Sequence, residues 1–100
     1  MTILCEGQHL FVAELSYLAP MAEVDALLEP HRAFLREQYA AGRFLASGAK
    51  VPRDGGVIIA IGTERAEIEA LLRRDPFQIA GVAQYRVIEF NPTMVAQGLR

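Results

Sequence analysis

The stretch GVIIAIG at residues 56–62 decides the fold. A short run of β-branched residues between two glycines predicts a strand. Successive side chains of a strand point to opposite faces of a sheet. Val57, Ile59 and Ile61 therefore share one face, while Ile58 and Ala60 share the other. A strand that is apolar on both faces indicates a sheet that is covered on both sides.

Three further strands are predicted around this one. The segments HLFVAELSY (9–17) and AQYRVIEF (83–90) are rich in apolar and aromatic residues and predict the first and last strands. RFLASGAKV (43–51) predicts the second strand. The turn PRDGG (52–56) joins it to the strand at 56–62, because Asp-Gly-Gly after a proline is a hairpin signal.

The segment between the first two strands predicts a helix that Pro30 interrupts. Pro20 suits the first turn of this helix, and Gly42 ends it. The positions that recur at steps of three and four along one helix face are Val24, Leu27, Leu28, His31, Phe34, Leu35, Gln38 and Tyr39. We expect Pro30 to kink the helix, or to divide it into a short turn and a main segment beginning near Pro30.

A second helix is predicted at ERAEIEALLRR (64–74), with Thr63 as its N-cap. The resulting order is strand, helix, strand, strand, helix, strand. This order predicts an α+β, ferredoxin-like fold, with a four-stranded antiparallel sheet and two main helices on one face. The simplest cover for the other apolar face is the same face of a second copy, which gives a homodimer. A single domain with an unusually apolar central strand is the alternative.

Length and composition bound the class of protein. One hundred residues fit one domain, and we expect an irregular lead-in at 1–8, the domain at 9–92 and a C-terminal tail at 93–100. The net charge of −2 and the absence of a Lys/Arg run do not indicate nucleic-acid binding. The longest apolar run is too short to span a membrane, and the first residues lack the basic start of a secretory signal. A cytoplasmic protein is expected.

His31 and Asp75 are the strongest candidates for chemistry. His31 lies on the apolar face of the first helix, where an unpaired buried donor costs about 1–3 kcal/mol. Asp75 lies in RRDPFQIAG (73–81), where Asp followed by Pro76 predicts the cap of a short helical turn that ends at Gly81. A carboxylate beside an imidazole fixes its tautomer, and the pair can then move a proton. A core histidine with one hydrogen bond and a carboxylate that only caps are the alternatives.

Other polar residues are weaker candidates. Ser47 on the second strand can bind a ligand oxygen or a backbone group, Arg53 at the hairpin can hold an anionic substrate or face solvent, and Phe77 is taken as a further substrate contact. Cys5 and His9 are too few ligands for a metal site, and His9 is expected at the surface. No metal or organic cofactor is expected, and the glycine-rich nucleotide-binding motifs are absent. The tyrosines are expected in the core or an interface: Tyr17, Tyr39 and Tyr85.

The segments PHRAFL, GRFLASGAKVPRDGGVIIA, DPF and QYRVIEFNP together resemble the YCII-related (YciI-like) family over residues 9–92. The resemblance implies a ferredoxin-like domain that pairs into a dimeric α/β barrel. It also implies a site with a His–Asp pair, here His31 and Asp75, with Ser47 as a neighbour. Relatives in the wider barrel superfamily act on small ring compounds by lactone isomerisation, dehalogenation and cofactor-independent oxygenation.

Three functional hypotheses follow. The first is a cofactor-independent enzyme in which His31 and Asp75 perform acid/base chemistry, leading to isomerisation or elimination, on a small cyclic or aromatic acid. The second is a non-catalytic dimeric module that binds a small ligand or a partner, in which the pair is a structural hydrogen bond. The third is a cofactor-independent monooxygenase of the same barrel superfamily. An enclosed pocket beside His31 favours the first over the second.

Overall fold

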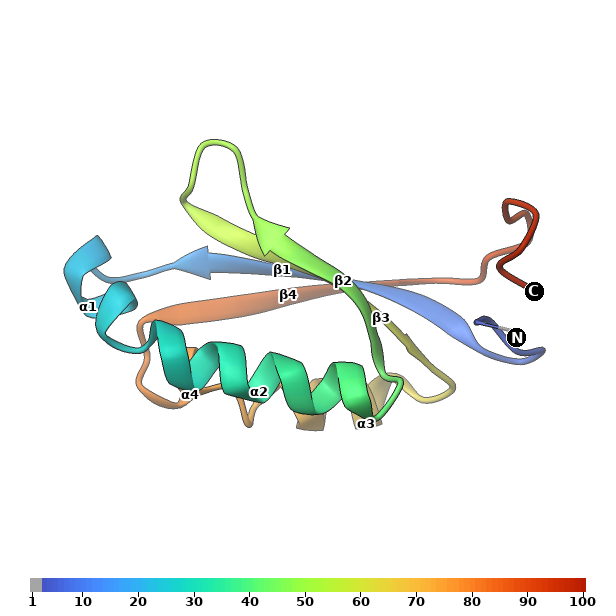
Figure 1. The fold of residues 1–100 in the computed structure, drawn as a ribbon, viewed down its shortest axis with the longest axis horizontal. Helices are drawn as coiled ribbons and strands as arrows, with labels where there is room; N and C mark the ends of the chain where they lie inside the picture. Colours follow the sequence, from blue (N-terminus) through green and yellow to red (C-terminus); the bar gives the residue numbers. More distant parts are fainter. Residues whose placement is uncertain (1–2) are drawn as a thin grey trace.

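The computed structural model describes residues 3–100, and within this range the chain forms four strands and four helices (Figure 1). The strands are β1 (His9–Tyr17), β2 (Phe44–Ala49), β3 (Gly55–Gly62) and β4 (Ala83–Phe90). The helices are α1 (Met21–Ala26), α2 (Leu28–Ala40), α3 (Arg65–Leu72) and α4 (Pro76–Ile79). Residues 1 and 2 of the expected lead-in lie outside the described residues. Residues 3–8 and 91–100 have neither helix nor strand, and the Leu4 N–H donates to the Leu99 carbonyl.

The strands form one sheet in the order β2-β3-β1-β4, and every neighbouring pair is antiparallel. The helices α2, α3 and α4 lie along one face of this sheet, and α1 lies beyond the ends of the strands (Figure 1). This is the ferredoxin-like α+β fold that the sequence predicts, and the prediction is confirmed. No helix among residues 3–100 is long and apolar enough to cross a membrane.

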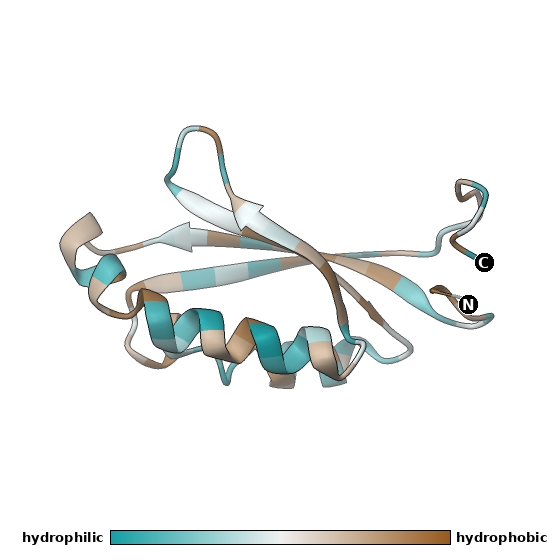
Figure 2. Cartoon of the chain, viewed as in Figure 1, coloured by the Kyte–Doolittle hydropathy of each residue, from teal (hydrophilic) through white to brown (hydrophobic). Residues whose placement is uncertain are grey.

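The helix-covered face of the sheet carries the core. Phe11 of β1 is opposite Ala60 of β3, and Ala13 is opposite Ile58, so the alternation predicted for both strands is confirmed. The buried members of the main cluster are Phe11, Ala13, Phe34, Phe44, Ile58, Ala60, Ile68, Leu71 and Leu72. Burying one large apolar side chain of this kind stabilises the fold by roughly 1.5–3 kcal/mol. In Figure 2, α2 alternates between hydrophilic and hydrophobic colours, as expected for a helix with one buried side.

The opposite face of the sheet is also apolar. In the register of the sheet, Leu10 pairs with Phe90 and Val12 pairs with both Ile59 and Ile88. These five residues define the open sheet face. The Ile88 and Phe90 side chains are 45% and 44% exposed. This face crosses three adjacent strands, so it is a continuous apolar surface rather than a set of scattered residues.

The first predicted helix is divided into two helices, α1 and α2, which was one of the two outcomes expected from Pro30, the other being a kink. The division falls at Leu27, which is the C-cap of α1 and the N-cap of α2, three residues earlier than expected. Pro30 is consequently the third residue of α2, within the first turn, where backbone N–H groups have no partner inside the helix. Pro20 was expected in the first turn of α1 but is its N-cap.

The start of α3 corrects the prediction for Thr63. The N-cap is Glu64, in an extended conformation, and no side chain caps the helix. Gly62 still pairs with His9 in the sheet, so the chain needs both following residues to turn into the helix. The strand β2 is shorter than the predicted 43–51: it ends at Ala49, and the Lys50 N–H donates to the Gly55 carbonyl where the chain turns into β3.

The short helix α4 confirms the cap predicted for Asp75. Asp75 is its N-cap, Pro76 is its first residue, and the Phe77 N–H donates to Asp75 Oδ1. Gly81 follows the helix with φ of 74°, a left-handed conformation that favours glycine. The local sequence therefore determines where this carboxylate sits along the chain.

Replacing Gly55 with alanine tests the close approach of β1 and β3. A Cβ atom at Gly55 would lie 1.8 Å from the Leu15 carbonyl oxygen, so the two strands would have to separate. We expect Gly55→Ala to lower the free energy of unfolding by about 2–3 kcal/mol in urea denaturation. Gly48→Ala in β2 is the matched control, since nothing lies within 4 Å of its added Cβ, and it should change stability by less than about 0.5 kcal/mol. Equal stabilities for the two variants would contradict the packing described.

Candidate active site

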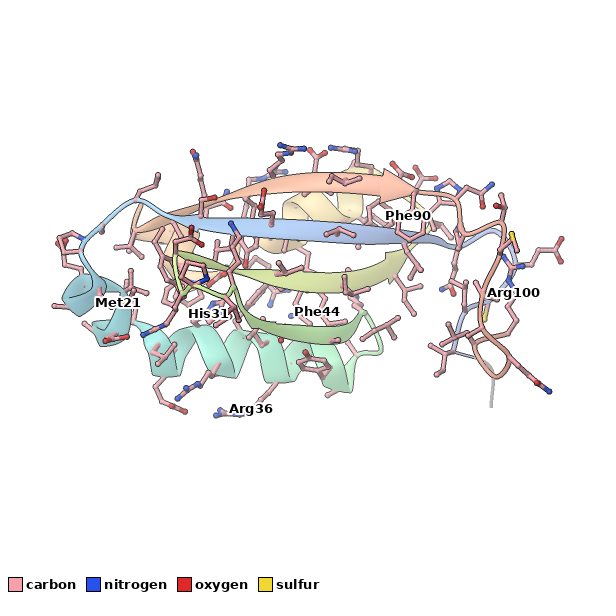
Figure 3. All side chains as sticks on the ribbon, turned by 90° about the horizontal axis from the view of Figure 1, so that it is seen from above. Met21, His31, Arg36, Phe44, Phe90 and Arg100 are labelled. Carbon is pink, nitrogen blue, oxygen red and sulfur yellow. The ribbon has the colours of Figure 1, made fainter. Side chains whose placement is uncertain are left out.

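His31 lies in the first turn of α2 and faces the sheet. The backbone N–H of His31 donates to the Leu27 carbonyl at 3.0 Å, which is the first helical hydrogen bond of α2 after the division at Leu27. Figure 3 shows the imidazole between the helix and the strands, while Arg36 on the same helix points away from them. The His31 residue is 9% exposed. The break at Leu27 therefore sets the direction in which the imidazole points.

Asp75 lies behind His31 and is fully buried, with 0% exposure. Its Oδ1 atom is 2.8 Å from His31 Nδ1 and accepts the Phe77 N–H at 3.0 Å. Its Oδ2 atom accepts the Tyr85 hydroxyl. A buried carboxylate needs such donors, because an unpaired buried charge is strongly unfavourable. Three elements, α2, α4 and β4, therefore meet at one side chain.

These contacts assign the proton on the imidazole. A carboxylate that receives a backbone N–H and a phenolic O–H acts as an acceptor, so the 2.8 Å contact is an Nδ1–H donor to Asp75 Oδ1. The neutral His31 ring then has a free lone pair on Nε2. This is the arrangement in which a histidine can accept a proton from a bound molecule.

The Phe77 ring stacks on one face of the His31 imidazole. The two rings are stacked, with centroids 4.0 Å apart and planes 6° from parallel. Phe77 is itself 1% exposed and packs edge-on against Tyr17 at 6.1 Å. The residue that the sequence suggested as a substrate contact therefore also fixes the plane of the His31 ring.

A cavity of about 380 Å³ opens beside His31. Four of the candidate residues from the sequence line this cavity: His31, Ser47, Arg53 and Phe77. The fifth candidate, Asp75, does not line the cavity. Most of the remaining wall is apolar and includes Leu15, Leu28, Leu35, Val57 and Ile58. A volume at the low end of the usual range for ligand pockets fits a small molecule.

His31 lines this cavity, and Nε2 is the ring nitrogen that Asp75 does not hold. Within the described residues, Nε2 has no hydrogen-bond partner in the protein, whereas Nδ1 is held by Asp75. In the same part of the chain, the only buried side-chain atom without a partner is Gln78 Oε1. Nε2 is therefore not enclosed by protein, and His31 lines the cavity.

The charged groups in the cavity wall are two arginines. Arg53 donates to Asp25 at 2.8 Å and lies over the Tyr17 ring, with 5.8 Å between the guanidinium carbon and the ring centroid. Arg32 is 3.6 Å from Glu29. The hydrogen bond from Arg36 is the main cause that lowers the pKa of Glu29, so Arg32 is the lesser partner of that carboxylate.

Arg32 is a wall residue that the sequence did not reveal. It directly follows His31 in the chain, but helix periodicity places adjacent residues on different sides, so sequence alone had no signal for it. No lining residue carries a carboxylate, since Asp25 and Glu29 both lie outside the wall. The charged side chains of the wall are therefore both cationic, and each is paired with a carboxylate outside the wall.

Ser47 provides a hydroxyl on the β2 side of the cavity. Its Oγ atom is 2.6 Å from the Tyr39 hydroxyl, and either group can be the donor. When Tyr39 donates, the Ser47 hydroxyl is left to donate to an oxygen of a bound molecule. Gly48 and Ala49 follow it in the wall and leave this side open.

Tyr85 is the contact that the sequence reasoning missed. It was expected as a core or interface residue, yet its hydroxyl donates to Asp75 Oδ2. Burial, with the Asp75 carboxylate as the second cause, raises the pKa of the Tyr85 phenol, so it stays protonated. The sequence signal was its place among the apolar positions of β4, where a buried hydroxyl needs a partner.

The remaining polar candidates lie apart from the cavity. His9 Nδ1 is 2.7 Å from Glu89 Oε2 in a half-exposed pair, and Cys5 is exposed. Among residues 3–100, no group of three or more His, Cys, Asp or Glu side chains is arranged to hold a metal ion. The groups that could act on a bound molecule are therefore those around His31.

Comparison with solved structures finds relatives in fold. 5-Chloro-2-hydroxyhydroquinone dehydrochlorinase (TftG) from Burkholderia phenoliruptrix AC1100, in complex with 2,5-dihydroxybenzoquinone, matches with a TM-score of 0.70 and 18% identity, over 82% of this chain and 93% of that one. Two structures of SnoaB, a cofactor-independent oxygenase from Streptomyces nogalater, match with TM-scores of 0.50 and 15% identity. They cover 91% and 90% of this chain and 98% and 97% of theirs. These likenesses concern the fold.

Comparison by sequence places the chain in a family. No curated protein matches it. The YCII-related domain matches residues 7–91, which include all four strands and all four helices described above. A match over most of the chain shows common membership, and it agrees with the resemblance carried by the segments around His31, Ser47 and Asp75. The chain therefore belongs to the YCII-related domain family.

Proposed function

We propose that this protein is a small-molecule enzyme in which His31 acts as a general base and then as a general acid. Asp75 orients His31, and the reaction is proton transfer on a small cyclic or aromatic acid, leading to isomerisation or elimination. The reaction as proposed uses only groups of the chain itself. The observation that carries the proposal is that His31 lines the cavity while its Nδ1 atom is 2.8 Å from Oδ1 of the buried Asp75.

The proposed reaction begins with the lone pair on Nε2. It takes a proton from a carbon or hydroxyl of the bound molecule, and the imidazolium that forms lies against the Asp75 carboxylate. The electrons left behind move toward an oxygen of the ring, where the Ser47 hydroxyl can donate. The imidazolium then returns the proton at another atom, which gives isomerisation. Alternatively, the electrons expel a leaving group, which departs with its electron pair and takes the proton from the imidazolium, which gives elimination.

The charge of the wall supports an anionic substrate. Arg32 and Arg53 both line the cavity, and no carboxylate lines it. Guanidinium groups bind carboxylates and ring oxyanions through paired N–H donors. The apolar part of the wall fits the body of a ring. Among the structural neighbours, the dehydrochlorinase binds 2,5-dihydroxybenzoquinone, so hydroxylated rings are the first compounds to screen.

The two alternative functions make different demands on the site. The cavity beside His31 fits the enzyme and also a module that binds a small ligand, so turnover of a bound ring separates these two functions. An oxygenase consumes O₂, whereas isomerisation and elimination do not. Oxygen uptake during turnover of a hydroxylated ring therefore separates the oxygenase from the proposed reaction.

We further propose that a second copy of the chain covers the open sheet face and forms a homodimer. Leu10, Val12, Ile59, Ile88 and Phe90 span three strands on the face that the helices leave uncovered. An identical apolar face on a second copy is self-complementary under two-fold symmetry. The family resemblance, which implies paired domains, supports the same arrangement.

Substitution of His31 tests the acid/base role. We expect His31→Asn to lower kcat/KM by about 10²- to 10⁴-fold on whichever screened ring compound is turned over, because the proton acceptor is gone. Incorporation of solvent deuterium into the substrate, followed by NMR, measures the proton transfer itself. His9→Asn is the matched control, since His9 also pairs with a carboxylate but lies outside the cavity. Unchanged deuterium incorporation by His31→Asn would refute the role.

Binding of charged and neutral rings tests the arginines. We expect Arg32→Gln and Arg53→Gln each to weaken the binding of benzoate by about fivefold, roughly 1 kcal/mol, and to leave benzamide almost unaffected. Arg74→Gln is the control, because Arg74 pairs with Glu37 away from the cavity wall. NMR titration gives the Kd values. Equal losses for benzoate and benzamide would show that the arginines shape the cavity without recognising charge.

The oligomeric state tests the role of the open sheet face. We expect the protein to sediment as a dimer and Ile88→Lys to shift it to monomer, because a lysine there would be buried without a partner. Ile79→Lys is the control, since Ile79 on α4 is 72% exposed and lies outside that face. A monomeric wild-type protein at micromolar concentration, or a dimer that tolerates Ile88→Lys, would exclude this interface.

A further inference from the structure

We propose that Tyr85 is a positioning residue that acts through Asp75 and holds His31 in its Nδ1–H tautomer. This inference rests on the proposed function of His31 and deepens it. Tyr85 lies on β4, on the side of the sheet that faces the helices, next to Ala83 and Val87 in the alternating pattern. It does not line the cavity beside His31, so any effect on a bound molecule passes through Asp75.

The Tyr85 hydroxyl completes the set of donors around Asp75. Oδ1 already receives two donors, His31 Nδ1–H and the Phe77 N–H. Among residues 3–100, the Tyr85 hydroxyl is the side-chain donor to Oδ2. Because Asp75 is fully buried, loss of this donor leaves half of a charged group unpaired. We expect the carboxylate to turn toward another donor, which weakens its hold on the imidazole.

The phenol is suited to this permanent donor role. Burial and the nearby carboxylate both raise the pKa of Tyr85, so it keeps its proton across the pH range in which proteins are folded. A serine or water in its place would be free to reorient. The phenol hydroxyl is instead carried on a rigid ring that packs against both core clusters. The direction of its hydrogen bond is therefore set by packing.

Tyr85 also lines a second cavity. That cavity, of about 290 Å³, is lined by Glu69, Leu72, Arg73, Gln78, Tyr85 and Val87, and Asp75 is not part of its wall. Gln78 Oε1 is a buried atom without a partner among the described residues, which is the kind of group that an ordered water satisfies. Without the Tyr85 hydroxyl, we expect water from this cavity to compete for Asp75 Oδ2.

NMR of the histidine ring tests this role without requiring a known substrate. Long-range ¹H–¹⁵N correlation identifies which ring nitrogen of His31 carries the proton. In the wild-type protein we expect the Nδ1–H form alone, with a slowly exchanging Nδ1 proton. In Tyr85→Phe, which differs by one oxygen, we expect the Nε2–H form to appear and the exchange of that proton to accelerate on the order of tenfold or more. Tyr39→Phe, which loses a hydroxyl contact to Ser47 instead, should leave both signals unchanged.

The outcomes separate the inference from the proposed function. A His31 ring in Tyr85→Phe with wild-type tautomer and exchange rate overturns the role of Tyr85, whether or not the protein is an enzyme. If a substrate is known, kcat should fall about tenfold in Tyr85→Phe with little change in KM, because Tyr85 does not touch the substrate cavity. If Tyr85→Phe fails to fold, the exchange rate of the Tyr85 hydroxyl proton in the wild-type spectrum still tests the role of Tyr85. A rapidly exchanging Tyr85 hydroxyl proton would exclude the hydrogen bond on which the role depends.

Discussion

The buried carboxylate of Asp75 is the interaction on which the site depends. It accepts hydrogen bonds from α2 through His31, from the backbone of α4 at Phe77, and from β4 through Tyr85. A charge with no exposure to water is tolerated only while these donors remain in place. The same contacts that make the carboxylate stable hold two helices and a strand together at one end of the sheet. Folding of this region and orientation of the histidine are therefore one event.

The cavity follows from this arrangement. Because Asp75 and Phe77 hold the imidazole by one edge and one face, the opposite edge with Nε2 is left to face the space between α2, β2 and β3. Apolar side chains from the sheet form most of the wall, and Arg32 and Arg53 supply its charge. The proposed proton transfer on an anionic ring would use the imidazole, the hydroxyl and the two guanidinium groups that line this one small volume.

The sequence predicted the elements well where local patterns decide them. Alternation gave the bounds of β1 and β4, and the Asp-Pro cap located α4, because both depend on neighbouring residues. The predictions failed where a distant strand intervenes. Thr63 is not the cap of α3, since the pairing of Gly62 with β1 delays the helix by one residue. Arg32 and Tyr85 were missed because their importance comes from elements that lie far away in the chain.

The sequence by itself determined the ferredoxin-like order of strands and helices, the two-faced central strand, and the candidate residues His31, Ser47, Arg53, Asp75 and Phe77. Hydrophobic periodicity and turn chemistry act over a few residues, so they can be read along the chain. Only the tertiary structure brought His31 and Asp75, 44 residues apart, to 2.8 Å and added Tyr85 as the third group. That meeting depends on how α2 and α4 pack against β4, and the apolar cluster that buries Phe77 and Ala83 is the physical reason why these elements come together.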